Sequence, residues 1–232
     1  MTPLYLHGLP GSGRERDLAC RPDLAVLDRD APSFAQLANR LPPGPLHLVG
    51  FSLGAAAALR LAALRPDAVA RLTLISAAAP LELGDFLPRM AGAAVFRAAR
   101  SHGQLAAMTK VQSVLMRLSP GLVVRMLLRD CGPADAAFFA EPGRRALLSQ
   151  IVRDGLTRGR AVYLRELPAY VQPWSGHLAH VRCPVTLWHG SDDRWAPVDM
   201  AEALATRLPR AELNRCDGLG HYTTLALVLP TL

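Results

Sequence analysis

The fold is decided by the segment Leu46-His47-Leu48-Val49-Gly50-Phe51-Ser52-Leu53-Gly54 and by the Ala- and Leu-rich run that continues to Leu64. A short apolar run that stops at a glycine is typical of a buried strand, so we expect a strand over 46–49. The run over 53–64 predicts a helix, which ends before Pro66 because proline cannot continue it. Ser52 is therefore predicted to lie in a tight turn between a strand and a helix.

Strand and helix patterns alternate on both sides of this segment. Ser33 is a plausible N-cap for a helix that runs to Arg40, and a second helix is expected near 198–207. Strands followed by helices predict a parallel sheet with helices on its faces. The fold class is therefore α/β, with a mostly parallel sheet of about six strands flanked by helices. The remaining expected strands are Pro3–Leu6, Leu24–Leu27, Arg71–Ile75, Val185–Trp188 and Ala211–Asn214.

The alternation breaks in the middle of the chain. From about Leu81 to Tyr170 there is no convincing strand, but there are several amphipathic helical stretches. We therefore expect an all-helical insertion at residues 81-175 within a core formed by residues 1-80 and 176-232.

Composition favours a soluble, cytoplasmic protein. Half of the 232 residues are hydrophobic, but no run approaches the roughly 20 apolar residues that a membrane span needs. The first residues also lack the basic start and apolar core of a secretion signal. The four cysteines lie far apart without a CxxC pair, which predicts buried thiols and no metal site; they are Cys20, Cys131, Cys183 and Cys216.

The net charge of +7 comes from 25 arginines and a single lysine, Lys110. This skew indicates a composition bias more than a nucleic-acid surface. Residues 81–180 hold 13 Lys+Arg and seven Asp+Glu, so nearly all of the excess lies in the helical insertion. One hypothesis is that these helices attract an anionic substrate, such as acyl-CoA, an acyl carrier protein or a carboxylate-bearing ester. The alternative is an ordinary solvated charged face.

Gly50-Phe51-Ser52-Leu53-Gly54 has the GxSxG pattern of a nucleophile elbow in the strand-to-helix context that this motif requires. A serine hydroxyl is a weak nucleophile and needs a histidine base oriented by a carboxylate. Two later strands lead into loops that carry such groups. Those loops are Gly190-Ser191-Asp192-Asp193 and Asp217-Gly218-Leu219-Gly220-His221.

These segments, together with His7-Gly8-Leu9-Pro10-Gly11, resemble the motifs of the α/β-hydrolase family over nearly the whole chain. The resemblance implies Ser52 as nucleophile, His221 as general base and acid, and Asp193 as the carboxylate that orients the histidine. It also implies an oxyanion hole formed by the backbone amides of Leu9 and Leu53, without a cofactor. Within the acid loop, Asp192 is the rival of Asp193.

The family usually has two strands before the HG motif, so the resemblance implies a sheet with its N-terminal strands trimmed. The insertion falls where the family places a helical cap, and we expect it to cover Ser52. Six apolar residues of this cap could face substrate or simply pack its core, and packing is the preferred interpretation for each. They are Phe96, Met108, Met116, Met126, Phe138 and Phe139.

The function that these motifs predict is hydrolysis of a carboxylic ester through an acyl-enzyme. A thioesterase or carbon–carbon bond hydrolase acting on an anionic acyl substrate is an alternative, as are a small peptidase resembling proline iminopeptidases and a non-catalytic ligand-binding protein. A phosphate-binding loop at Gly8–Gly13 is disfavoured because Arg14 and Glu15 stand where lysine and a hydroxyl are needed.

Overall fold

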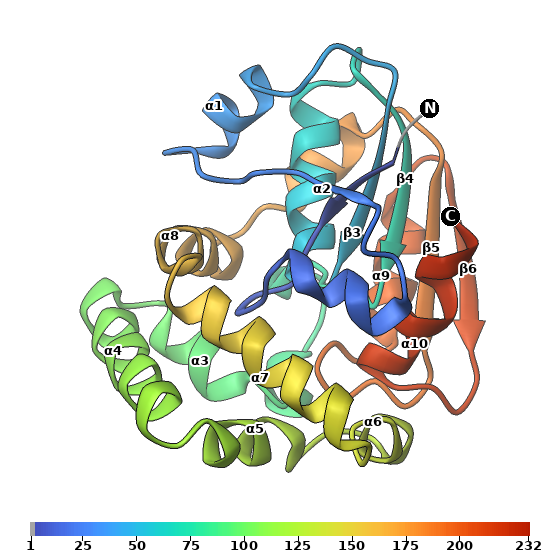
Figure 1. Cartoon of the computed structure of the whole chain (residues 1–232). Coiled ribbons are helices and arrows are strands. Elements are labelled where there is room, and N and C mark those ends of the chain that lie inside the picture. Colours follow the sequence, from blue (N-terminus) through green and yellow to red (C-terminus); the bar gives the residue numbers. More distant parts are fainter. Residues whose placement is uncertain (1–2) are drawn as a thin grey trace.

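A computed structural model describes residues 3–232, so residues 1 and 2 of the predicted core lie outside the described residues. Six strands form one sheet in the order β2-β1-β3-β4-β5-β6, and every neighbouring pair is parallel (Figure 1). The predicted fold class is confirmed. The strands are β1 Pro3–Leu6, β2 Ala25–Val26, β3 Leu46–Phe51, β4 Val69–Ile75, β5 Val185–Gly190 and β6 Ala211–Cys216.

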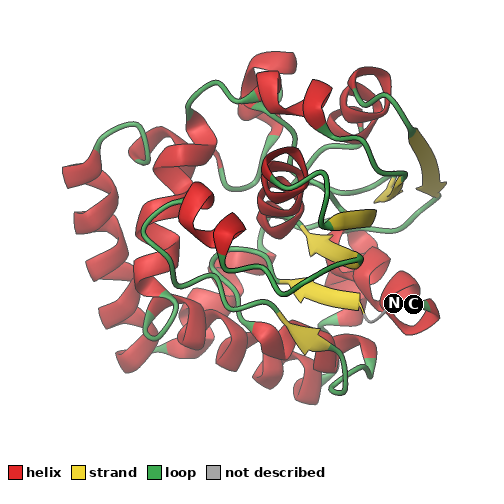
Figure 2. Cartoon of the chain, turned by 90° about the horizontal axis from the view of Figure 1, so that it is seen from above, coloured by secondary structure: helices red, strands yellow, loops and turns green. Residues whose placement is uncertain are grey.

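Helices lie on both sides of the strands (Figure 2). The Ser33 side chain accepts a hydrogen bond from the amide of Gln36 at 3.2 Å and so caps the helix that follows it, as predicted. Cys20 is exposed, contrary to the prediction of a buried thiol, because it is the left-handed residue that ends a surface turn. The helices around the sheet are η1 Gly13–Ala19, α1 Phe34–Asn39, α2 Leu53–Leu64, α9 Asp199–Arg207, α10 His221–Val228 and η5 Leu229–Thr231.

Between β4 and β5 the chain forms helices only, and we call residues 81–180 the helical segment. In Figure 1 its helices α3 to α7 lie beyond the end of the sheet toward which the strand arrows point. No single helix of residues 3–232 could span a membrane, whereas α4 and α5 meet the length and composition test only as a pair bent by 119°. The segment contains η2 Leu81–Leu83, η3 Leu87–Arg89, α3 Ala93–Ala98, α4 His102–Leu118, α5 Pro120–Leu128, α6 Pro133–Phe138, α7 Pro142–Leu156, α8 Arg160–Val171 and η4 Ser175–His180.

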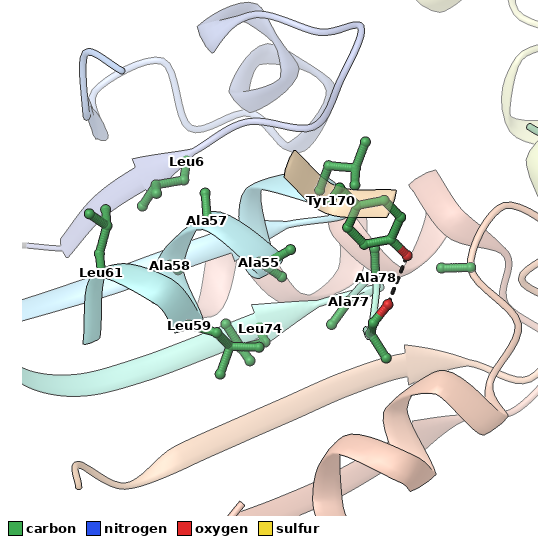
Figure 3. Packing of buried hydrophobic residues seen from close by; sticks show 14 of the residues in the cluster. Leu6, Ala55, Ala57, Ala58, Leu59, Leu61, Leu74, Ala77, Ala78 and Tyr170 are labelled. Carbon is green, nitrogen blue, oxygen red and sulfur yellow. Dashed lines mark hydrogen bonds between the residues drawn. The ribbon is translucent and has the colours of Figure 1, made fainter. Parts of the chain in front are cut away.

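Part of the core lies where α2 packs on β3 and β4. Ala55, Ala58 and Leu59 of the helix are fully buried against the sheet, as is Leu74 of β4 (Figure 3). Each buried leucine contributes about 2 kcal/mol of hydrophobic stabilisation. The alanines have little side-chain volume, so the helix axis can lie close to the strands and brings the turn at its N-terminus against the sheet.

Helix α8 is tied to this core by polar contacts. The Tyr170 hydroxyl donates to the Ala79 carbonyl oxygen at 2.8 Å, the contact drawn as a dashed line in Figure 3. Arg29, which follows β2, forms a buried ion pair with Glu166 at 2.8 Å. Removal of one partner of such a pair leaves an uncompensated buried charge. These contacts fix the helical segment to the end of the sheet.

A glycine pair tests the packing of α2. A Cβ on Gly54 would lie 2.1 Å from the Leu6 carbonyl oxygen, whereas a Cβ on Gly103 of α4 would meet nothing within 4 Å. We expect Gly54→Ala to lower the free energy of unfolding by about 3 kcal/mol, because the helix must move away from β1. Gly103→Ala should raise the same quantity by about 0.5 kcal/mol through helix propensity. Urea denaturation measures both, and equal stability of Gly54→Ala and the wild type would contradict the close packing.

Candidate active site

Ser52 lies at the turn between β3 and α2, with φ 57° and ψ −123°. This left-handed conformation is strained for a serine and persists only where the surroundings impose it. Here the Ser52 amide donates to the Ile75 carbonyl oxygen at 3.0 Å, and a Cβ on Gly50 would lie 2.5 Å from Ala55 Cα. The sheet and the helix therefore hold the serine side chain at the carboxyl end of β3.

The loops after β5 and β6 bring Asp193 and His221 together. His221 Nδ1 lies 2.7 Å from Asp193 Oδ2, and both side chains are buried. The other carboxylate oxygen, Asp193 Oδ1, accepts hydrogen bonds from the amides of Trp195 at 2.8 Å and Ala196 at 2.9 Å. Asp192 is exposed and makes its side-chain contact with Ser191 instead. Asp193 is thus the aspartate that contacts the histidine.

The pair is electrostatically coupled. Burial lowers the pKa of His221, but the charge and hydrogen bond of Asp193, together with the charges of Asp135 and Glu15, outweigh burial and raise this pKa above its ordinary value of 6.5. Burial likewise raises the pKa of Asp193, whereas the opposing charge and hydrogen bond of His221 hold that pKa below its ordinary value of 3.8. The carboxylate therefore stays ionised and fixes the Nδ1 proton, which leaves Nε2 of the neutral histidine as the basic atom.

Two adjoining cavities meet at Ser52. The smaller, of about 40 Å³, is lined by Ser52 and His221, and no hydrogen bond joins these two side chains among residues 3–232. The larger, of about 80 Å³, is lined by Ser52 together with Leu9 and Leu53. Helix α2 begins at Leu53, so the Leu53 amide has no acceptor within its helix. A serine, a basic histidine and amide donors around two cavities that meet at the serine can carry out acyl transfer.

A buried carboxyl group that lines the smaller cavity holds the loop after β1 by a hydrogen bond. Glu15 accepts hydrogen bonds from the Gly8 amide at 2.9 Å and from the Tyr5 hydroxyl at 2.8 Å. Burial raises the pKa of Glu15 to about 7. From the sequence, Glu15 was interpreted only as a residue that disfavours phosphate binding, and the local pattern contains no signal that it folds back on Gly8.

A residue of the helical segment holds the histidine loop. Asp135 of α6 is buried and accepts hydrogen bonds from the amides of His221 at 2.8 Å and Thr223 at 2.9 Å. These are amides of the first turn of α10, so Asp135 caps that helix from a distant part of the chain. On the other side, the Ser76 hydroxyl donates to the His221 carbonyl oxygen at 3.0 Å. The sequence analysis missed Asp135 because its target lies 86 residues away.

The apolar residues expected in the cap have different surroundings. Phe96 lines the larger cavity beside Ser52, and Met116 and Phe139 are fully buried in the packing of the helical segment. Met126 is 60% exposed, contrary to both expected roles. It lies on the outer face of α5, while its neighbour Leu127 lines both cavities.

Comparisons with known proteins show which family this chain is similar to. A sequence profile of the family described as "alpha/beta hydrolase fold" matches residues 8–225. Over 53 residues, or 23% of this chain and 21% of the relative, the chain is 49% identical to a pimeloyl-[acyl-carrier protein] methyl ester esterase of Aromatoleum aromaticum. The aligned stretch therefore spans about a fifth of that relative.

Solved structures share the fold at low sequence identity. A thermophilic esterase from Thermogutta terrifontis superposes with a TM-score of 0.69 at 17% identity, covering 100% of this chain and 86% of that one. The enol-lactonase from Burkholderia xenovorans LB400 superposes with a TM-score of 0.66 at 15% identity, covering 99% and 87%. At these identities the likeness concerns the fold alone.

The contacts of Asp135 generate a prediction about pH dependence. The base role expected for His221 requires its neutral form, so kcat/KM should rise with pH through its elevated pKa. The Asp135 charge contributes to that elevation. Asp135→Asn should therefore move the rising limb of the kcat/KM profile to lower pH, and Asp135→Ala, which removes the cap, should lower kcat about tenfold or more with little change in KM.

The matched control is Glu141→Ala. Glu141 also caps a helix of the segment, accepting from the Gly143 amide at 3.2 Å, but it is exposed and lies outside both cavities. The pH profile of kcat/KM for Glu141→Ala should equal that of the wild type. Identical profiles and kcat values for the Asp135 variants and the control would contradict a positioning role for Asp135.

Proposed function

The chain belongs to the α/β-hydrolase fold family, and from this membership we propose that it is a serine hydrolase that cleaves a carboxylic ester through a covalent acyl-enzyme. The coarser assignment, a hydrolase, is supported by the family and by the esterases and lactonases that share the fold. The observation that carries the finer proposal is the buried Asp193–His221 pair, bonded at 2.7 Å, which borders one cavity with the strained Ser52.

In the proposed mechanism, Ser52 Oγ attacks the ester carbonyl carbon while His221 Nε2 accepts the serine proton. The amides of Leu9 and Leu53 donate hydrogen bonds to the oxyanion of the tetrahedral intermediate. The intermediate collapses as His221 returns the proton to the leaving alcohol oxygen, which leaves an acyl group on Ser52. Water, deprotonated by His221, then attacks the acyl-enzyme, and release of the acid restores the serine.

We further propose that the helical segment acts as a cap and steers substrates whose acyl group is attached to an anionic carrier. Arg125, Arg129 and Arg145 line one hollow on the outer surface of the segment. No charged side chain of residues 3–232 lines the larger cavity beside Ser52, so the charge would act on a carrier outside the cavity. The relative from Aromatoleum aromaticum is named for an ester of an acyl-carrier-protein-bound group, which is consistent with an acyl carrier protein or acyl-CoA as partner.

Replacement of the nucleophile tests the reaction class. Ser52→Ala should lower kcat for p-nitrophenyl butyrate by at least about a thousandfold and abolish labelling by a fluorophosphonate probe, because no other group can form the acyl-enzyme. Ser33→Ala, which removes the cap of α1 outside both cavities, should retain kcat and labelling. Full activity of Ser52→Ala would refute the mechanism. A folded wild-type protein that neither labels nor turns over would favour the non-catalytic ligand-binding alternative.

The salt dependence of turnover tests the carrier proposal. For butyryl-CoA, kcat/KM should fall severalfold between about 20 and 200 mM salt, because ions screen attraction to the basic helices. For the neutral p-nitrophenyl butyrate, kcat/KM should change little. Equal salt dependence for the two substrates would contradict steering, and their relative kcat values compare thioester with ester hydrolysis.

A further inference from the structure

Three polar atoms that are buried and lack hydrogen-bond partners belong to side chains that line the larger cavity at Ser52. They are Gln112 Oε1, Tyr163 Oη and Trp195 Nε1, and none of them has a partner among residues 3–232. Eight buried side-chain polar atoms of the described residues lack hydrogen-bond partners, and three of the eight belong to side chains that line this one cavity. Native proteins satisfy nearly all buried polar groups, so a cluster of unsatisfied ones requires an explanation.

The three atoms come from three separate parts of the chain. Gln112 is in α4, Tyr163 is in α8, and Trp195 follows β5 two residues after Asp193. The remaining cavity lining consists of apolar side chains and glycine apart from Ser52 itself. The cavity is thus an apolar chamber with a few polar atoms, the composition typical of small-molecule sites in which the polar groups set specificity.

The position of His221 distinguishes the two sides of the scissile bond. His221 protonates the leaving group in the proposed mechanism, and it lines the smaller cavity but not the larger one. The leaving alcohol or thiol therefore belongs on the side of the smaller cavity. The acyl group belongs in the larger cavity, where it meets Gln112 and Tyr163, which line only this cavity of the two, and Trp195, which lines both.

We propose that Gln112, Tyr163 and Trp195 form a polar subsite that binds an uncharged oxygen function, a carbonyl or a hydroxyl, on the acyl group of the substrate. This inference rests on the proposed function, because it assigns the acyl side of the same reaction. The Tyr163 hydroxyl and the Trp195 indole N–H donate to the ligand oxygen, and the Gln112 side-chain oxygen accepts from a ligand hydroxyl.

The chemistry of the lining selects a neutral group over a carboxylate. Burial raises the pKa of Tyr163, so its phenol remains a neutral donor at physiological pH. No arginine, lysine or histidine of the described residues lines this cavity, so a carboxylate there would be a buried charge without a counterion. The cavity holds only about 80 Å³, which favours a short acyl chain.

The test compares two p-nitrophenyl esters of similar shape. The levulinate ester carries a ketone in its acyl chain, and the isocaproate ester has a methyl branch in place of the ketone oxygen. We expect wild-type kcat/KM to favour levulinate by about tenfold or more, because an alkyl group leaves the three polar atoms unsatisfied. Tyr163→Phe should bring the ratio close to one, mainly through slower levulinate turnover.

The matched control is Tyr170→Phe. Tyr170 is a second buried tyrosine of α8, but its hydroxyl already donates to the Ala79 carbonyl oxygen at 2.8 Å and it does not line the cavity. Loss of the Tyr170 hydroxyl should lower the free energy of unfolding and leave the levulinate-to-isocaproate ratio of kcat/KM unchanged. If circular dichroism shows that Tyr163→Phe does not fold, Gln112→Met is the test variant, with an ester whose acyl chain carries a hydroxyl group. Gln112→Met should lower the ratio of kcat/KM for that hydroxyl ester to kcat/KM for the alkyl ester.

The outcomes separate this inference from the proposed function. Turnover of both esters at a ratio near one, unchanged in Tyr163→Phe, would overturn the subsite while leaving the serine mechanism intact. Absence of turnover and of fluorophosphonate labelling would overturn the mechanism. In that case calorimetry of amide binding still tests the subsite. Tighter binding of levulinamide than of isocaproamide, with the difference lost in Tyr163→Phe, would support the subsite, and equal binding of the two amides would overturn it.

Discussion

Helix α2 approaches strand β1 so closely that only the absence of a side chain at Gly54 keeps it clear of the Leu6 carbonyl oxygen. This approach forces the chain to reverse direction within one residue, and Ser52 takes the positive φ that the reversal requires. It also brings the first amides of α2 next to the loop that follows β1. The positions of the proposed nucleophile and of the proposed oxyanion donors thus share one cause, which is the packing of one helix on the parallel sheet.

Local patterns were sufficient to predict the six strands and the helices α1, α2 and α9. The strand before Ser52, the helix after it and the cap at Ser33 each depend on residues within a few positions of one another. The resemblance to the α/β-hydrolase motifs implied that Asp193 would orient His221, and parallel strands deliver the loops of both residues to the same edge of the sheet. The contact between those two residues is long-range in sequence but follows from the topology.

Contacts between separate elements could not be predicted from local sequence patterns. The bonds from Asp135 to the start of α10 and from Glu15 to the loop after β1 depend on how segments pack, and neither residue carries a recognisable local motif. The outward position of Met126 was also missed, because hydropathy alone does not distinguish the two faces of a helix that is covered on one side only.

The bonds between Asp135 and α10 have a consequence for evolution and protein engineering. The histidine loop is completed by a carboxylate from α6, so the helical segment and the sheet are not independent modules. A chimera that received its helical segment from another member of the family would lose the hydrogen-bond acceptor for these amides unless the inserted segment carried an aspartate at the same place. Exchange of this segment between relatives is therefore constrained at Asp135, a residue that lines neither cavity at Ser52, and recombination that preserves it leaves the cavity lining able to vary.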